Sequence, residues 1–349
     1  MDKDIYYMNE AIKLAKTGIG KTGSNPSVGC LIVQNDQIIS KARTKNGGRP
    51  HAEHLAISKV ASKNLIGSTI YISLEPCCIN KADKTSCVEK IITSKISKVV
   101  IGAIDPNPEI NGKSIEILKK HNIETKIGIL NDKCEQLILG FKKRIILNLP
   151  YITLKLATSL DGKIALFNKK SKWITSEKLR YSSHKLRAKN DAILTGIGTV
   201  IADDPLLTCR LNNKDDHNPI RIIIDTDLKI SKNSQILKTA KNIQTTIFTN
   251  KKHINSYHDA NVIHVNKTKD GLNIKEILHH ITNLGINNLL IEAGQKISTS
   301  FIKENLVDKI VLYQSKKIIG GDGIDAIGDL NISDINQCIE FKTEIIHDK

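Results

Sequence analysis

The chain is predicted to be an α/β protein made of two sheet domains. In both halves, short apolar runs typical of strands alternate with amphipathic stretches typical of helices, which predicts sheets covered by helices. The length of 349 residues favours two domains over one. A polar helix end at 142–144 is followed by Pro150 and an apolar run, so we expect residues 1–146 to form one domain and residues 150–349 the other.

The first half predicts one sheet with helices on both of its faces. Asp4 is expected to cap a helix that ends near Gly18, and Pro50 is expected at the first position of another. Further helices are expected at 88–95, 113–121 and 132–145, and strands at 28–33, around 38–39, and at 69–74, 98–103 and 123–127. Helices on both faces of a sheet give a three-layer α/β/α domain.

Three residues of the first half have the types and the order of zinc ligands. His51 is followed by Glu53 two positions later, and Cys77 and Cys87 come further along the chain. One histidine and two thiolates leave the fourth tetrahedral position of zinc to water, which then loses a proton near neutral pH. Glu53 could take that proton and hand it to a departing amine, as general base and then general acid. The pattern is typical of zinc-dependent deaminases.

The deaminase interpretation makes two demands on local structure. Residues two apart on a regular helix point in different directions, so His51 and Glu53 can share a metal only if the first turn after Pro50 meets it nearly end-on. Cys87 should lie at the amino end of the helix that follows it, where the helix dipole favours a thiolate.

Two other interpretations of these residues stay open. Cys77 and Cys87 could be ordinary buried thiols, with His51 a loop histidine. Alternatively, the zinc site could be closed and structural, with Cys78 or His54 filling the fourth position.

The second half predicts another sheet with helices. Strands are expected at 151–156, 192–195, 220–224, 245–248, 262–265, 289–291 and 309–313, and helices at 177–189, 274–284 and 295–304. Gly294 precedes the last of these helices, and a glycine turn at a helix amino end can receive a pyrophosphate, although it is more often a plain turn. No GxGxxG fingerprint is present, which disfavours a conventional dinucleotide-binding fold.

The composition favours anionic partners without predicting nucleic-acid binding. Lys and Arg number 52 against 36 Asp and Glu, a formal net charge of +16, which attracts phosphorylated metabolites and nucleic acids alike. The lysines are spread along both halves, with no basic stripe interleaved with aromatic residues. We therefore expect a phosphorylated small molecule as the partner and no nucleic acid.

The chain is expected to work in the cytoplasm as a homo-oligomer. Its start lacks a secretory pattern, and no apolar run approaches the roughly 18 residues of a membrane helix, so no membrane partner is expected. Seven cysteines, two of them assigned to metal, fit a reducing compartment.

Ordered motifs along the chain resemble the bifunctional deaminase and reductase family of riboflavin biosynthesis. In the first half they are Asn25-Pro26, Gly29-Cys30, His51-Ala52-Glu53, Glu75-Pro76-Cys77 and Asp105-Pro106-Asn107-Pro108. In the second half they are Lys155-Leu156, Ser159-Leu160-Asp161-Gly162, Ser171, Trp173-Ile174-Thr175, Leu186-Arg187, Gly198-Thr199-Val200 and Ala202-Asp203-Asp204-Pro205. The resemblance covers nearly the whole chain.

The resemblance implies two folds and two reactions. The first half would be similar to cytidine deaminases and would use one zinc ion per chain. It would hydrolyse an amine of a phosphoribosylated pyrimidine, 2,5-diamino-6-(5-phosphoribosylamino)pyrimidin-4(3H)-one, and release ammonia. The second half would be similar to dihydrofolate reductase and would use NADPH to reduce the ribosyl group to ribityl.

For the deaminase, the resemblance agrees with the assignment from ligand chemistry and adds four positions. It implies that Asn25, Lys84, Asp105 and Asn107 lie near the substrate. Asn25 and Asp105 each precede a proline, however, and such pairs are also simple turn formers.

The segment between the two zinc cysteines departs from the family. Residues 78–86 read CINKADKTS, with one residue added and without the usual histidine, glycine and two prolines. Lys84, or Lys81 in its place, could still meet the substrate phosphate as a point charge, or either could be a solvated loop lysine. The departure puts substrate placement in doubt more than metal binding.

For the reductase, the resemblance implies a cofactor site, a substrate site and one catalytic lysine. The residues that would face NADPH are Ala157, Trp173, Thr199, Asp203, Thr226, Gly294, Gln295, Lys296, Ile297, Ser298, Thr299 and Ser300. Those that would face the phosphoribosyl substrate are Ser171, Arg187, Leu207, Arg210 and Glu292. Lys155 would stabilise charge or move a proton.

Each of these residues also has a purely structural interpretation. Trp173 could be the large anchor of a core, Arg187 a solvated helix residue and Asp203 a helix cap.

Two rival functions remain. The chain could be a reductase whose first half keeps zinc but has lost activity, as the altered 78–86 segment would allow. It could instead deaminate flipped nucleic-acid bases or bind RNA through its charge, but residues 151–349 would then have no explanation.

Overall fold

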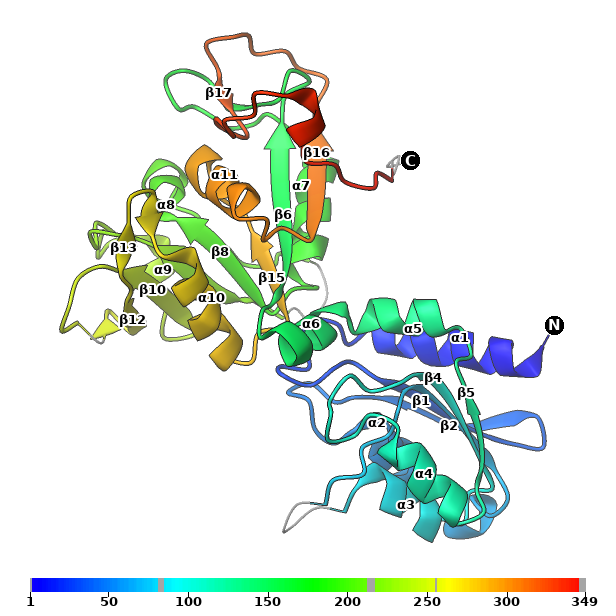
Figure 1. Ribbon diagram of the computed structural model, residues 1–349. Coiled ribbons are helices and arrows are strands. Elements are labelled where there is room, and N and C mark those ends of the chain that lie inside the picture. The colour runs from blue at the N-terminus through cyan, green and yellow to red at the C-terminus, as the bar shows by residue number, and fades with distance from the viewer. Residues whose placement is uncertain (1, 81–84, 212–216, 255, 345–349) are drawn as a thin grey trace. The chain divides into compact units, whose positions relative to one another are not determined.

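The computed structural model describes residues 2–80, 85–211, 217–254 and 256–344 (Figure 1). The chain divides into two compact units. The first comprises residues 1–151 with 188–191 and 278–288, and the second comprises 152–187, 192–277 and 289–349. Among the described residues, no helix has both the length and the apolar composition needed to cross a membrane.

The first unit is built on a five-stranded sheet in the order β2-β1-β3-β4-β5. Its strands are β1 (Gly29–Gln34), β2 (Gln37–Arg43), β3 (Thr69–Leu74), β4 (Lys98–Ala103) and β5 (Glu124–Ile127). Strand β1 pairs antiparallel with β2 and β3, while β3, β4 and β5 run parallel. The central β3 and β4 are buried almost throughout, as expected for parallel strands covered on both faces.

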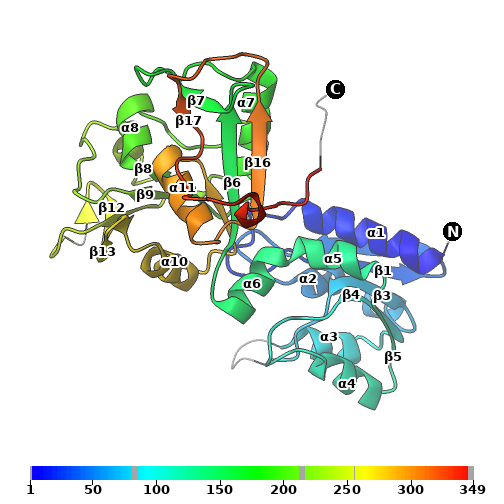
Figure 2. The same cartoon turned by 45° about the horizontal axis from the view of Figure 1, so that its top comes forward.

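Helices cover both faces of this sheet, which confirms the predicted three layers. The helices are α1 (Lys3–Lys16), α2 (Ala52–Ser58), α3 (Cys87–Thr93), α4 (Lys113–Lys120), α5 (Asn131–Leu137) and α6 (Leu139–Leu147), with a 3₁₀ turn at Ser62–Asn64. Figures 1 and 2 show α1 and α5 on one face and α2, α3 and α4 on the other. Helix α1 buries Met8, Ala11, Ile12 and Ala15, a helical spacing that forms its apolar stripe.

Two expectations about helix starts were wrong. Asp2, and not Asp4, caps α1, because its carboxylate accepts from the Asp4 backbone N–H at 2.9 Å. The Asp4 carboxylate instead binds the Tyr71 hydroxyl and Lys126. Pro50 is not the first residue of α2, since His51 is its N-cap.

The single helix expected over 132–145 is two helices. The helix is interrupted at Ile138, whose φ of −116° is not helical. On either side of the break, the Cys134 side chain is fully buried and Gly140 packs so closely that a Cβ there would come within 2.4 Å of Asn288. Contacts with the rest of the unit therefore override an apolar pattern that continues through the break.

The second unit contains an eight-stranded sheet in the order β11-β12-β10-β9-β8-β15-β6-β16. The strands are β6 (Tyr151–Thr158), β8 (Ala192–Gly196), β9 (Ile220–Ile224), β10 (Thr245–Thr249), β11 (Ser256–Tyr257), β12 (Ala260–His264), β15 (Asn288–Ile291) and β16 (Lys309–Gln314). Small two-stranded pairs join β13 (Lys267–Thr268) to β14 (Gly271–Leu272) and β7 (Lys163–Ala165) to β17 (Ile324–Asp325). All seven long strands that the sequence predicts for this half are present.

The helices of the second half are α7 (Glu177–Arg187), α8 (Ile197–Asp203), α9 (Gln235–Lys238), α10 (Ile274–Asn283) and α11 (Gln295–Lys303), with a 3₁₀ turn at Ile335–Gln337. In Figure 1, α11 lies in front of the sheet and α7 behind it. Helix α8 was not predicted, because two glycines, Gly196 and Gly198, at its start resemble a loop. Helix α8 begins directly after β8, and α11 begins after a short segment at 292–294 that follows β15.

Candidate functional site

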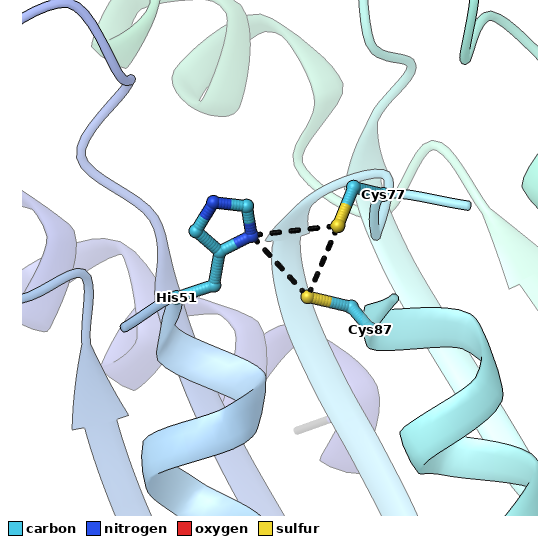
Figure 3. A group of neighbouring side chains, drawn as sticks. All are labelled: His51, Cys77 and Cys87. Carbon is cyan, nitrogen blue, oxygen red and sulfur yellow. Dashed lines mark hydrogen bonds between the residues drawn. The ribbon is translucent and has the colours of Figure 1, made fainter. Parts of the chain in front are cut away.

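His51, Cys77 and Cys87 form one cluster in the first unit (Figure 3). The His51 Nδ1 atom lies 3.3 Å from the Cys87 Sγ and 3.5 Å from the Cys77 Sγ, and the two sulfurs are 3.4 Å apart. Tetrahedral zinc with bonds of roughly 2.0–2.3 Å sets its donors about 3.5 Å from each other. The three donors therefore fit a zinc ion as they stand.

Each member of the cluster stands at the end of a secondary-structure element. His51 is the N-cap of α2, Cys87 is the first residue of α3, and Cys77 follows β3. Cys87 thus occupies the helix start that the deaminase interpretation requires. A hydrogen bond from the Cys87 thiol, together with His51, lowers the pKa of Cys77 to about 4, so the pair of sulfurs readily carries a negative charge.

Glu53 lies in the first turn of α2 and is 3% exposed. Its carboxyl interacts with all three residues of the cluster, so the start of the helix does meet the group. Burial raises the pKa of Glu53, which brings it closer to the range in which a carboxyl group can both accept and donate a proton.

The structure does not bring Cys78 or His54 into the cluster. Among the described residues, the group of possible metal ligands here consists of His51, Cys77 and Cys87 alone. The Cys78 sulfur instead faces the Glu109 carbonyl, 3.9 Å away. Three protein donors leave a fourth position open, which is the arrangement of a catalytic zinc and not of a structural one.

Asp105 and Asn107 lie in the loop between β4 and α4. Asp105 is 5% exposed, and burial raises its pKa to about 6, with the Cys77 sulfur contributing in the same direction. Its carboxylate accepts from the Asn107 backbone N–H at 2.8 Å. Asn25 donates to the Gly48 carbonyl on the loop before α2. Lys84 and its suggested substitute Lys81 lie outside the described residues.

The second unit holds a cavity of about 1010 Å³. All of the predicted reductase residues line it except Ser298 and Thr299, namely Lys155, Ala157, Ser171, Trp173, Arg187, Thr199, Asp203, Leu207, Arg210, Thr226, Glu292, Gly294, Gln295, Lys296, Ile297 and Ser300. Ser298 and Thr299 are buried on another face of α11, where the Thr299 hydroxyl accepts from the Gly328 N–H at 2.7 Å. A run of consecutive helical residues cannot all face one cavity.

A buried ion cluster lies at the wall of this cavity. Arg187 approaches Glu292 with two nitrogens, at 2.7 and 3.0 Å, and Lys155 lies 3.5 Å from the same carboxylate. Burial opposes the charge of Glu292, but Arg187 and Lys155 together lower its pKa to about 2. The Arg187 side chain is only 13% exposed, so the interpretation of this arginine as a solvated helix residue was wrong.

Trp173 is not the anchor of a core, because it is 60% exposed. The guanidinium of Arg180 lies 4.4 Å from its ring centroid, a stacked cation–π contact. Asp203, the last residue of α8, receives the Ser171 hydroxyl at 3.5 Å and lies 3.7 Å from Lys172. These side chains form one mouth of the cavity.

Sequence reasoning missed three cavity residues on α7, namely Arg180, Ser183 and His184. Arg180 and His184 line the cavity together with Arg187. Their spacing of four and then three residues places them on one face of a helix. That periodicity was present in the sequence and would have found them.

The cavity suits a dinucleotide. Two helix starts face it, at Ile197 of α8 and Gln295 of α11, and both helices have a glycine as N-cap. Free backbone N–H groups at such starts bind phosphate oxygens. The volume is at the upper end of the roughly 300–1,000 Å³ usual for ligand pockets.

Two family models match separate parts of the chain. A model of the cytidine and deoxycytidylate deaminase zinc-binding region matches residues 1–103, and a model of the RibD C-terminal domain matches residues 150–345. The riboflavin biosynthesis protein RibD of Buchnera aphidicola is 37% identical to this chain, over 99% of this chain and 95% of its own length.

Solved structures agree over the whole length. Acinetobacter baumannii RibD is 32% identical, with a TM-score of 0.88, 99% of this chain covered and 96% of that protein. A Thermotoga maritima diaminohydroxyphosphoribosylaminopyrimidine deaminase and 5-amino-6-(5-phosphoribosylamino)uracil reductase is 33% identical, with a TM-score of 0.87 and coverages of 97% and 94%. The chain therefore belongs to the RibD family, the zinc- and NADPH-dependent bifunctional deaminase and reductase enzymes of riboflavin biosynthesis.

Proposed function

We propose that this chain deaminates 2,5-diamino-6-(5-phosphoribosylamino)pyrimidin-4(3H)-one with residues 1–146 and then reduces the ribosyl group of the product to ribityl with residues 150–349. The observation that carries the proposal is the pair of sites in one chain. One is a His51, Cys77 and Cys87 cluster with a buried carboxyl beside it, and the other is a dinucleotide-sized cavity with a buried ion cluster.

In the deaminase, the chain's residues hold the metal and move one proton. His51, Cys77 and Cys87 would hold the zinc ion, which would supply an activated water as nucleophile. The Glu53 carboxylate would accept a proton from the attacking water and return it to the departing amine nitrogen, which would leave as ammonia. The raised pKa of Glu53 supports this role, because a stronger base holds the proton between the two steps.

Asn25, Asp105 and Asn107 are assigned to substrate placement in the deaminase. Asp105 is close enough to the cluster to interact electrostatically with Cys77 and His51. Its buried carboxyl and the neighbouring Asn107 amide offer the hydrogen-bonding groups that a pyrimidine edge requires.

In the reductase, the chain's residues orient the opened sugar beside the cofactor. The residues lining the cavity would hold NADPH, which would supply a hydride to the C1 carbon of the sugar. Arg210 and Ser171 would hold the phosphoribosyl group, and Glu292 would fix Arg187 and Lys155 at the cavity wall. Lys155, 15% exposed and paired with Glu292 at 3.5 Å, would stabilise charge or deliver a proton, either to the ring oxygen as its bond to C1 breaks or to the retained nitrogen as the imine is reduced.

We further propose the cytoplasm as the site of action and a homo-oligomer as the working form. The ligand thiols of Cys77 and Cys87 must stay reduced to bind zinc, which supports a reducing compartment.

A coupled assay tests the proposal on the zinc-loaded chain. It supplies the phosphoribosyl diaminopyrimidine and NADPH and follows ammonia release and NADPH oxidation separately. Ammonia followed by NADPH consumption is the expected result. NADPH oxidation only with predeaminated substrate would mean that the altered 78–86 segment has silenced the first site. Tight, steeply salt-dependent RNA binding with neither activity would favour the nucleic-acid alternative.

A further inference from the structure

Glu75 is a buried carboxylate with no part in the chemistry described above. It follows β3 directly, precedes Pro76 and the zinc ligand Cys77, and is 3% exposed. Its backbone N–H continues the sheet by donating to the Ala103 carbonyl at 2.9 Å. Its side chain accepts three backbone N–H groups and is not among the ion pairs found in the part of the chain that the structure describes.

The three donors come from the two ends of one loop. The Asp105 N–H lies 3.2 Å from Oε2 at the start of the β4–α4 loop, and the Gly112 N–H lies 3.0 Å from the same oxygen at its end. The Ser114 N–H, in the first turn of α4, lies 3.2 Å from Oε1. One carboxylate therefore staples both ends of the 105–112 loop to the residue that leads into the metal site.

This carboxylate also replaces a missing helix cap. Gly112 is the N-cap of α4 and has no side chain to satisfy the first N–H groups of the helix. An anion at a helix start is favoured by the helix dipole, and Glu75 supplies it from another part of the chain. Ser114 adds a second tie, since its hydroxyl donates to the Pro76 carbonyl.

Between the residues that Glu75 binds, the 105–112 loop is held by hydrogen bonds within the loop itself. The Asn107 side-chain oxygen accepts the Glu109 N–H at 3.0 Å, and the Asn111 amide donates to the Asp105 carbonyl at 3.1 Å. The geometry points to Glu75 as the positioning residue of the deaminase, which sets the distance of Asp105 and Asn107 from the metal. This assignment rests on the proposed role of these two residues in substrate placement.

Glu75→Gln tests the assignment in the full-length, zinc-loaded chain. A carboxamide has one accepting oxygen, and its NH₂ would face a backbone N–H, so at least one of the three bonds is lost. We expect the deaminase KM to rise by about tenfold, because a hydrogen bond to a charged acceptor typically changes an equilibrium by that factor or more, while kcat falls less than about threefold. Amide hydrogen exchange at Asp105, Gly112 and Ser114 should accelerate.

Two control measurements and two control variants keep the result specific. Zinc content and reductase activity on predeaminated substrate should both stay at the level of the original chain, which reports that both units are folded. Asp4→Asn removes another poorly exposed carboxylate of the first unit, on the opposite face of the sheet, and should leave the deaminase KM unchanged. Glu75→Asp keeps the charge one methylene further away and should recover part of the KM.

Two outcomes overturn the inference. An unchanged KM with faster amide exchange would show that the staple does not govern substrate placement. Loss of zinc from both Glu75→Gln and Glu75→Asp would show that Glu75 only stabilises the segment that carries the zinc ligand Cys77. Failure of the proposed function itself looks different, because the unsubstituted chain would then release no ammonia at all.

Discussion

Two buried glutamates in the two units have opposite pKa shifts. Glu53 and Glu292 are 3% exposed overall and 10% exposed in the side chain, respectively. Burial raises the pKa of Glu53, whereas Arg187 and Lys155 lower that of Glu292 to about 2 despite its burial. The difference teaches that burial alone does not define the role of a carboxyl group. A carboxyl group beside thiols is suited to exchange protons, and one beside two cations is a fixed anion.

The largest expected effect is at Glu53. Glu53→Gln should reduce ammonia release by about 10³-fold, because general acid–base catalysis contributes roughly 10²–10⁴-fold and the amide cannot carry the proton. Zinc content and NADPH oxidation with predeaminated substrate should not change. Glu89→Gln, an exposed carboxylate in the first turn of α3, is the matched control and should retain ammonia release. Equal loss in both variants would refute the proton role.

At Glu292 we expect a smaller effect on the reaction rate than at Glu53, but a large effect on the stability of the second unit. Glu292→Gln leaves Arg187 and Lys155 buried without their anion, which typically costs about 3–5 kcal/mol. Trp173 is the single tryptophan of the chain, so its fluorescence reports unfolding of the second unit. Asp325→Asn removes a 54% exposed carboxylate from an ion pair with Lys163 and should cost less than about 1 kcal/mol. Similar losses of unfolding free energy in both variants would mean that the buried ion cluster stabilises the unit no more than an exposed ion pair does.

The pH dependence of the Glu292 cluster has a definite sign. The carboxyl pKa is about 2 in the folded chain against an ordinary 4.5, so its stabilising contribution is complete above pH 4.5 and is lost as the pH falls toward 2. The stability gap between the original chain and Glu292→Gln should therefore shrink by about 3 kcal/mol over that window. Urea titrations of both chains, followed by Trp173 fluorescence, measure the gap. A gap that is constant with pH would contradict the assignment of a fixed anion.

The smallest expected effect concerns the stacked pair at the cavity mouth. Arg180→Lys keeps the charge but removes the planar group that lies 4.4 Å from the Trp173 ring centroid. Since an exposed cation–π contact is worth about 0.5–1 kcal/mol, we expect the KM for NADPH to rise by about two- to fivefold. Lys185→Ala breaks a similar contact with Tyr181 on the same helix but outside the cavity, and it should not change this KM.

The metal site was predictable from the residues alone, whereas the reductase site was not. A histidine and a glutamate followed by two cysteines is an order of residue types that points to a zinc site and to few other functions. The residues are His51, Glu53, Cys77 and Cys87, and each ligand lies near the end of a predicted helix or strand. The reductase cluster joins Lys155 to Glu292, 137 positions apart. No local pattern connects residues on separate strands and helices, so this cluster depended on the resemblance to a known family.

The errors in the fold have physical causes of the same kind. Alternation of apolar runs predicted the long strands, because burial on a sheet imposes it. The break at Ile138 was missed because it depends on packing between distant segments, and the helix after Gly196 was missed because the glycines at its start resemble a loop. Ser298 and Thr299 were assigned with their neighbours as a continuous stretch, although a helix turns successive side chains in different directions.

One backbone hydrogen bond at the metal site bears on the length of the segment between the two zinc cysteines. The Val88 N–H donates to the Cys77 carbonyl at 3.1 Å, so the segment between the two cysteines is tied shut at its ends by the fold itself. Adding a residue to a segment whose ends are already joined costs little free energy. The unusual CINKADKTS sequence at 78–86 is the kind of variation that such a closed segment permits within an enzyme family.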